Sequence, residues 1–273
     1  MINALSIDLE YWWSPELLTK YLPEEKEDLI IESLYPLLDL LDKYNTSATF
    51  FVLGMVAEKY PGIVEEIYEK GHEIASHAYS HKTLYDLGKE GFEEEIKKSV
   101  KLLSKYNPIG FRAPSFSIDN NTKWALEILE KYGFNYDSSI FPIKTMLYGV
   151  LDAPLNIYKP SGDDVARHDP NGKIIEFPLT VVRIGKNIPI AGGFYLRMLP
   201  FWFLKWGIKK VNRDRPAIIY VHPWETYPDT PRLKIPLSSR FITYYGINST
   251  LKKIETLLNE FKFKPVKNVL YEI

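Results

Sequence analysis

The sequence predicts an α/β protein in which parallel strands alternate with helices. Short apolar runs, each closed by a polar residue or a glycine, alternate with longer segments whose leucines recur at helical spacing. Polar residues of the kind used in catalysis follow the apolar runs directly. In barrels and in open α/β sheets that place is the carboxyl edge, where active sites form. Strands that alternate with helices imply parallel βαβ units.

The first half of the chain contains most of these units. Strands are expected where short apolar runs are bounded by turn residues, at 2–7, 48–53, 73–76, 109–113 and 135–137. Helices are expected between them, where apolar residues lie on one face and charged residues on the other, at 24–44, 63–70, 90–106 and 121–131.

The second half has a different composition. Proline, glycine and aromatic residues are frequent from 141 to 193, which predicts long loops or an inserted hairpin, with a strand at 174–182. A helix at 199–212, a strand at 217–221 and a helix at 249–261 follow, the last with Ser249 as its N-cap. Because no repeat or linker interrupts the chain, we expect a single domain over 1–273, with an insertion or long loops at about 141–200.

Composition narrows the possible partners and ligands. The 273 residues carry a net charge of −1, which provides no basic field for nucleic acid or for an anionic membrane. There is no cysteine, so a bound metal must use His, Asp or Glu. No apolar run is long enough to span a bilayer, and the first residues form a strand with no basic stretch before it. We therefore expect a cytoplasmic protein without a membrane span; its oligomeric state is unknown.

His77 and His81 are the first candidates for metal ligands. On one helical turn, residues four apart face the same way and two imidazoles can reach one ion. Ala78 follows His77, so the general base of an HExxH motif is absent. The spacing alone also fits two unrelated histidines. The apolar strand that ends just before His77 favours the metal site, because it delivers this side chain to the expected active-site edge.

Asp8 and Glu10 lie at the end of the first expected strand. At positions i and i+2 both carboxylates project from one face. Left unpaired at a buried strand end, the two charges would be costly. A carboxylate that completes a His-His site gives three protein ligands and an open position, the usual arrangement of a hydrolytic zinc. The second carboxylate could then act as a general base.

Three further polar residues lie at or directly after the carboxyl ends of expected strands. Arg112 could pair with a carboxylate and lower its pKa, or form an ordinary surface salt bridge. His222 could be a general acid that protonates a leaving group, or a core histidine. Asp137 could orient such a histidine, although taken singly it reads as a turn residue.

Taken together, these residues resemble the polysaccharide deacetylases, carbohydrate esterase family four. Five ordered motifs carry the resemblance: Asp8-Leu-Glu10, Ser76-His-Ala-Tyr-Ser-His81, Phe111-Arg-Ala-Pro-Ser-Phe116, Tyr136-Asp-Ser-Ser-Ile-Phe141 and Val221-His-Pro-Trp-Glu225. The branch associated with exopolysaccharide loci is the most similar, through Ala191-Gly-Gly-Phe-Tyr195 and the stretch from Arg240 to Gly246. The resemblance spans nearly the whole chain and implies a distorted, incompletely closed (β/α) barrel of about seven parallel strands.

The resemblance also implies roles for individual residues. Glu10, His77 and His81 would hold one divalent ion, usually Zn²⁺. Asp8 would be the base, Arg112 would tune it, and His222 would be the acid. The family has adjacent aspartates where this chain has Leu9 between its two acids, so Asp8 and Glu10 could exchange roles. The family also has an aromatic residue directly after the proline, whereas Ser115 stands before Phe116 here.

The implied activity is hydrolysis of an N-acetyl or O-acetyl group on a sugar or polysaccharide. Water held by the metal would attack the acetyl carbonyl, with a carboxylate as base and a histidine as acid. Aromatic side chains near the motifs would form the sugar-binding walls, namely Tyr11, Trp12, Trp13, Phe116 and Trp224. The alternatives are an allantoinase-like amidohydrolase acting on a small cyclic amide, and a catalytically silent carbohydrate-binding barrel.

Overall fold

A curled sheet of parallel strands forms the centre of the protein. The structure is a computed structural model and describes residues 1–145 and 147–272. Within these residues seven strands run in the order β9-β1-β2-β3-β4-β5-β6, and a short eighth strand, β10, pairs with the start of β1. The strands are β1 (Ile2–Leu9), β2 (Thr49–Val52), β3 (Glu73–Ser76), β4 (Gly110–Phe111), β5 (Tyr136–Asp137), β6 (Ile175–Glu176), β9 (Ile218–Val221) and β10 (Lys262–Lys264).

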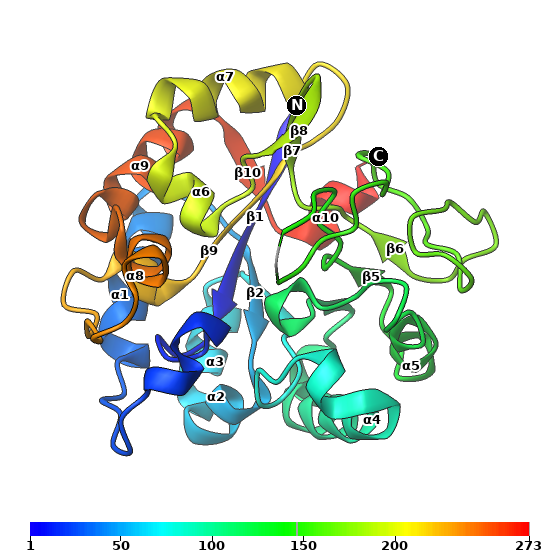
Figure 1. Ribbon diagram of the computed structural model, residues 1–273, viewed down its shortest axis with the longest axis horizontal. Coiled ribbons are helices and arrows are strands. Elements are labelled where there is room, and N and C mark those ends of the chain that lie inside the picture. Colours follow the sequence, from blue (N-terminus) through cyan, green and yellow to red (C-terminus); the bar gives the residue numbers. More distant parts are fainter. Residues whose placement is uncertain (146, 273) are drawn as a thin grey trace.

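Helices cover the outside of this sheet (Figure 1). Crossovers from one parallel strand to the next require such connections, which is why strands and helices alternate along the chain. The helices are α1 (Ile30–Lys43), α2 (Gly54–Lys59), α3 (Pro61–Glu69), α4 (Leu84–Leu103), α5 (Ala125–Lys131), α6 (Gly193–Met198), α7 (Phe201–Val211), α8 (Leu237–Tyr244), α9 (Ile247–Glu260) and α10 (Val266–Tyr271). Short 3-10 turns add η1 (Glu16–Tyr21), η2 (Ser104–Tyr106), η3 (Pro114–Phe116) and η4 (Pro223–Thr226).

Alternation along β1 separates the inside of the barrel from its helical coat. Leu5, Ile7 and Leu9 pack with the apolar residues of the surrounding helices. Ala4, Ser6 and Asp8 lie on the opposite, inner face, and all three are buried. Two of these inner side chains are small, which leaves room inside the barrel for long side chains from neighbouring strands.

The barrel does not close by a continuous ladder between β6 and β9. Single contacts bridge the gap instead: Tyr220 N donates to Ala191 O at 2.8 Å, and Ile218 N donates to Thr180 Oγ1 at 2.7 Å. The backbone at Gly192 approaches β9 very closely. A Cβ on this residue would lie 1.9 Å from Tyr220 O, so only glycine fits there. The predicted α/β fold, an incompletely closed (β/α) barrel, is confirmed.

Two sequence predictions in the second half are wrong. The continuous strand expected at 174–182 is divided into β6 and the first strand of an antiparallel hairpin, β7 (Val181–Ile184) and β8 (Lys186–Pro189). Pro178 lies between the two pieces and cannot donate to a ladder. Ser249 is not an N-cap, because α9 begins two residues earlier at Ile247, behind Gly246 in the left-handed conformation.

The segment between β5 and β6 is the long irregular region that the composition predicted. Among the described residues of 138–174 no helix or strand is formed, and isolated bridges such as Tyr158 with Glu176 hold the chain in place. No helix in the described part of the chain is long and apolar enough to cross a membrane.

Candidate active site

The predicted polar residues meet in one pocket at the carboxyl ends of the strands. Asp8 is the last inner-face residue of β1, and Glu10 follows one residue beyond the strand. Both carboxylates line a pocket of about 160 Å³ together with His77, His81 and His222. The strand period of two therefore does what the sequence predicted, since it sends both acids to the same side.

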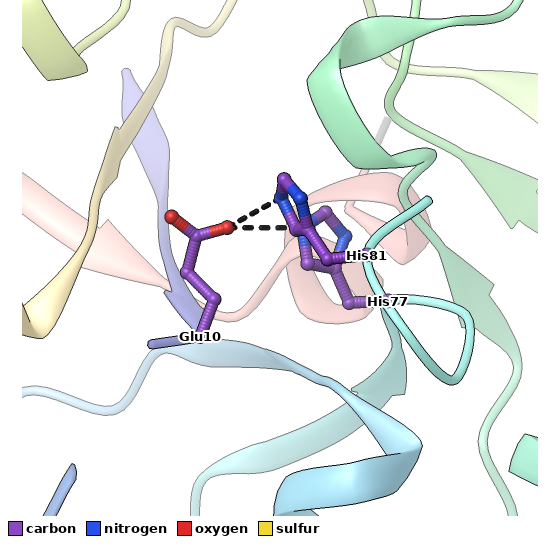
Figure 2. Close-up of side chains that lie close together, drawn as sticks. All are labelled: Glu10, His77 and His81. Carbon is purple, nitrogen blue, oxygen red and sulfur yellow. Dashed lines mark ion pairs between the residues drawn. The ribbon is translucent and has the colours of Figure 1, made fainter. Parts of the chain in front are cut away.

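Glu10, His77 and His81 form a compact group of possible metal ligands (Figure 2). Glu10 Oε2 lies 2.6 Å from His81 Nε2 and 3.7 Å from His77 Nε2. This oxygen is buried, yet it has no hydrogen-bond partner in the described structure. A buried carboxylate oxygen without a partner, facing two imidazole nitrogens, is the donor set that fits a divalent ion such as Zn²⁺.

Neighbouring groups fix the orientation of two of these side chains. His77 Nδ1 donates to Arg112 O at 2.7 Å, which leaves Nε2 as a lone-pair donor toward Glu10. Trp224 Nε1 donates to Glu10 Oε1 at 3.1 Å, so the other carboxylate oxygen is turned to the histidines. A partner that orients each metal ligand is a common feature of metal sites.

The two histidines do not share a helical turn, so that expectation is wrong. His77 follows β3 directly, and His81 lies in the loop before α4. Ala78 and His81 both have positive φ, 59° and 62°, which turns the loop back on itself and brings the imidazole rings to 5.2 Å. Such conformations are unfavourable for residues with a Cβ and often occur at functional sites.

Arg112 pairs with the first of the two acids. Its Nη1 lies 2.6 Å from Asp8 Oδ1 and 2.9 Å from Ser6 Oγ, and both Arg112 and Asp8 are buried. Arg112 Nε and Nη2 donate to Ser138, through its carbonyl oxygen and its hydroxyl. The guanidinium thus lies inside the barrel, in the room left by the small inner residues of β1, and holds Asp8 in one position.

On the opposite wall, His222 has its own buried carboxylate and arginine. His222 Nδ1 donates to Glu225 Oε2 at 2.8 Å, and Arg197 Nε donates to Glu225 Oε1 at 2.7 Å. Arg197, on α6, also donates to the carbonyl oxygens of Ile242 and Tyr245. His222 Nε2 is directed toward the metal-ligand group, 3.7 Å from Asp8 Oδ2 and 3.7 Å from Glu10 Oε1.

These contacts shift the ionisation of the site. Burial alone would lower the pKa of His222, but the carboxylates of Glu10 and Glu225 outweigh it and raise the pKa to about 9. Burial would raise the pKa of Glu225, but Arg197 and His222 lower it to about 2. The pKa of Glu10 is held well below its ordinary value, because the charges of His81 and His222 outweigh the effect of burial. At neutral pH Glu10 and Glu225 are therefore ionised and His222 is protonated.

Asp137 does not orient His222, contrary to the sequence prediction. It is buried on β5, where Ser139 Oγ donates to its Oδ1 at 2.5 Å and Glu176 lies opposite it in the register of β6. Glu225 occupies the predicted place, three residues after His222 in the same turn. The signal for it was the sequence His-Pro-Trp-Glu225, in which a proline starts a short turn that brings the carboxylate back to the imidazole.

Only some of the aromatic residues predicted to form sugar-binding walls line the pocket. Phe116 and Trp224 line the pocket, and the Trp224 ring is stacked on His222. Tyr11 and Trp12 are not among the lining residues; Tyr11 belongs to the core beside the helices, and Trp12 Nε1 donates to Glu27 O. Strand alternation explains this outcome for Tyr11, since it follows Glu10 and faces the opposite side. Trp13 stacks on Tyr11 at 4.3 Å.

Several walls of the pocket were not predicted. They come from segments far apart in the sequence, namely Glu16, Leu17, Leu147, Tyr148, Phe194 and Ile242. Ser115 and Phe116 are both left-handed, with φ of 51° and 50°, so the residue that departs from the family pattern is accommodated by a sharp turn at the pocket. No local pattern marks residues that meet only through the fold.

Two families match consecutive parts of the chain. Residues 30–136 match the family described as polysaccharide deacetylase, and residues 138–271 match one described as a domain of unknown function (DUF3473). His77, His81 and Arg112 lie in the first part, whereas Arg197, His222 and Glu225 lie in the second. Both matched parts therefore contribute side chains to the one pocket.

Two named deacetylases are similar to parts of the chain, and one solved structure shares its fold. A peptidoglycan-N-acetylglucosamine deacetylase of Bacillus cereus is 40% identical over 95 residues, covering 33% of this chain and 34% of that protein. Chitin deacetylase 1 of Saccharomyces cerevisiae is 37% identical over 97 residues, covering 34% of this chain and 31% of that protein. A solved allantoinase structure superimposes with a TM-score of 0.61 at 14% identity, covering 99% of this chain and 89% of that one, and shares the fold. The chain spans only between 27% and 51% of the length of curated relatives such as these two deacetylases.

Proposed function

We propose that this chain, which belongs to the polysaccharide deacetylase family, is a metal-dependent hydrolase that removes acetyl groups from a sugar or polysaccharide. One observation carries the proposal: a carboxylate paired with an arginine, a Glu-His-His group and a protonated histidine face one another in a single pocket. A binding protein has no use for a base, an acid and a metal site together, so this combination favours catalysis over a silent carbohydrate-binding barrel.

Glu10, His77 and His81 would hold the divalent ion, for which we propose Zn²⁺. When bound, such an ion supplies a Lewis acid that polarises a carbonyl and makes a water molecule acidic enough to react near neutral pH. Asp8 is the less suitable ligand, because it does not belong to the Glu-His-His group and a guanidinium cation already binds its Oδ1. This favours Glu10 as the ligand and leaves Asp8 for proton transfer.

Asp8 is the proposed general base. Its Oδ1 is bound by Arg112, while its Oδ2 faces the pocket, 3.7 Å from His222 Nε2. Arg112 fixes the rotamer of Asp8, so a proton can pass from the attacking water to Oδ2 with little reorganisation. The arginine tunes this step through the carboxylate and does not itself need to touch the substrate.

His222 is the proposed general acid. It is protonated at neutral pH, and its Nε2 lies 3.7 Å from Asp8 Oδ2 across the pocket. Breaking the carbon–nitrogen bond of an acetamide leaves an amine, which is a poor leaving group until it receives a proton. His222 Nε2 would donate that proton, while Glu225 holds the imidazole by Nδ1 and Arg197 holds Glu225.

The shape of the pocket suits a short acyl group on a sugar. Its apolar walls include Phe116, Tyr148 and Trp224, and these rings offer flat surfaces for the acetyl methyl or for the face of a sugar ring. The two relatives are named as a peptidoglycan-N-acetylglucosamine deacetylase and a chitin deacetylase, which makes an N-acetylated amino sugar the proposed substrate here.

Acetate release tests the proposal. We expect the purified, zinc-loaded protein to release acetate from chito-oligosaccharides and to lose that activity on chelation of the metal. Allantoin serves as the competing substrate, because an allantoinase shares the fold. Ring opening of allantoin without acetate release would replace the proposal. Sugar binding with neither a metal nor acetate release would support a silent barrel. The cytoplasmic location stays a prediction.

A further inference from the structure

A second cleft lies beside the proposed catalytic pocket. Its charged side chains are mainly basic, whereas several carboxylates line the pocket. It measures about 580 Å³, within the range of small-molecule sites. Its walls are the loop after Phe141 and the β7–β8 hairpin, which Asn187 Nδ2 joins by donating to Pro142 O at 2.7 Å. Lys144, Arg183 and Lys186 line it, with Asp152 as the only acid among the lining residues.

The three cations of this cleft have no protein counter-ion. None of them forms a salt bridge with another residue of the ranges 1–145 and 147–272, although exposed lysines elsewhere in the chain are often paired, as Lys43 is with Glu255. Arg183 lies directly opposite Asn187 in the hairpin, and Lys186 precedes it. A concave surface with three unpaired cations and an amide is suited to carboxylate groups.

The basic cleft and the catalytic pocket share a wall. Leu147 and Tyr148 line the pocket, while Ile143, Lys144 and Leu151 of the same loop line the cleft. On the other side, Phe194 lines the pocket and the next residue, Tyr195, lines the cleft. A chain of sugars that has one ring in the pocket can therefore continue over this wall into the cleft.

We infer that the basic cleft, lined by Lys144, Arg183, Lys186 and Tyr195, binds an acidic sugar of the same polymer whose acetylated sugar occupies the catalytic pocket. The inference rests on the proposed function and names its substrate class: polysaccharides in which N-acetylated sugars alternate with uronic acids. The cations bind the carboxylates, and Tyr195 with the apolar wall packs against the sugar rings. A neutral polymer such as chitin would use the pocket alone.

Binding of a polyanion that contains no acetyl group tests the cleft separately from catalysis. Oligogalacturonate is titrated into the protein by calorimetry, with Arg183→Glu/Lys186→Glu as the test variant. Both positions are exposed on a hairpin, so folding is preserved. Lys209→Glu/Lys252→Glu is the matched control, because it makes the same change in net charge at exposed lysines of α7 and α9.

The wild type and the control should bind oligogalacturonate with equal affinity, and that affinity should fall as NaCl is raised. The test variant should bind about tenfold more weakly, since two attractive charges become repulsive. Equal binding by the test and control variants, or no binding by the wild type, would overturn the inference. Complete displacement by inorganic phosphate at equal ionic strength would also overturn it, because the cleft would then be a simple anion site.

Acetate release then connects the cleft to the substrate. On hyaluronan oligosaccharides, which alternate glucuronate with N-acetylglucosamine, the test variant should show a KM raised about tenfold at unchanged kcat. On chito-oligosaccharides and on phenyl acetate it should match the wild type. If no substrate releases acetate, the proposed function fails while calorimetry still reports on the cleft. If acetate is released with equal KM by the test and control variants, the inference about the cleft is wrong and the proposed function stands.

Discussion

The two walls of the proposed active site use the same device for different ends. On one wall Arg112 pairs with Asp8 at 2.6 Å, and the carboxylate itself faces the reacting groups. On the other, Arg197 pairs with Glu225 at 2.7 Å, and the carboxylate faces His222 instead. All four members of these ion pairs are buried. The same kind of arginine–carboxylate pair thus positions the proposed base directly on one wall and the proposed acid, through its imidazole, on the other.

Burial explains why each carboxylate needs its arginine. A lone ionised carboxylate in the barrel would lose several kcal/mol of hydration, and its pKa would rise until it took up a proton. The arginine places an opposite charge beside the carboxylate, and its remaining donors fix its own position: Arg112 binds Ser6 and Ser138, whereas Arg197 binds the carbonyl oxygens of Ile242 and Tyr245. A buried pair of this kind contributes orientation more than stability.

The largest expected effect distinguishes the proposed metal ligands from the proposed acid, His222. His77→Ala should abolish both metal binding and acetate release, because it removes one of the three proposed ligands. His222→Ala should keep one bound metal per chain and lose about 10²–10⁴-fold in turnover, the range of a general acid. Metal content by elemental analysis and acetate release by a coupled assay check this pair. Equal loss of metal in both variants would contradict the division of roles.

The next prediction compares the two carboxylates by isosteric changes. Asp8→Asn should slow hydrolysis of both an N-acetyl sugar and phenyl acetate, since activation of water is needed for either substrate. Glu225→Gln should slow only the amide, by about 10²-fold, because a phenolate leaves without protonation and the histidine acid is then not needed.

Steady-state kinetics on the two substrates provide the readout for these variants. A general loss of folding in Glu225→Gln would lower both activities together, so phenyl acetate serves as the internal control. If Glu225→Gln lost both activities in equal proportion, with its melting temperature unchanged, the carboxylate would act on the base or the metal and the comparison of the two walls would be wrong.

The sequence predicted Asp8 and Arg112 of the first wall, but only His222 of the second. Asp8 and Glu10 follow from the strand period of two, and Arg112 from its place at a strand end. The fold follows from the same patterns, apart from short elements such as α8 and β10 and the interruption at Pro178. These are decided by tertiary contacts rather than by local periodicity.

Arg197 could not be found in this way. It lies on a helix of six residues, and its partners come from 28 residues later for Glu225 and 48 for Tyr245. The resemblance assigns no role to the motifs Ala191–Tyr195 and Arg240–Gly246. The structure shows that the segments around them meet at this guanidinium. A site assembled from segments without a common period leaves no signal in a single sequence.

The smallest expected effect concerns two neighbouring buried carboxyl groups, those of Asp137 and Glu176. Neither forms a salt bridge within the described part of the chain. Burial raises the pKa of Glu176 well above its ordinary value, and the neighbouring Asp137 adds to the shift. The folded protein therefore keeps a proton that the unfolded chain releases above about pH 4.5. The stabilising contribution of Glu176 is fully present below that pH and is lost as pH rises toward the folded-state pKa.

Glu176→Gln has no proton to release, and its amide can still accept from Ile140 N and donate to Asp137. Its free energy of unfolding should therefore exceed that of the wild type on the order of 1 kcal/mol at pH 8 and by less at pH 5. Urea unfolding at the two pH values measures the difference, with the exposed Glu94→Gln as the control that shows no trend. A difference that is constant or shrinks with pH would mean that Glu176 is ionised in the folded protein. It would then be a buried charged carboxylate without an arginine of its own, and the pairing of one arginine with one buried carboxylate would not hold throughout the barrel.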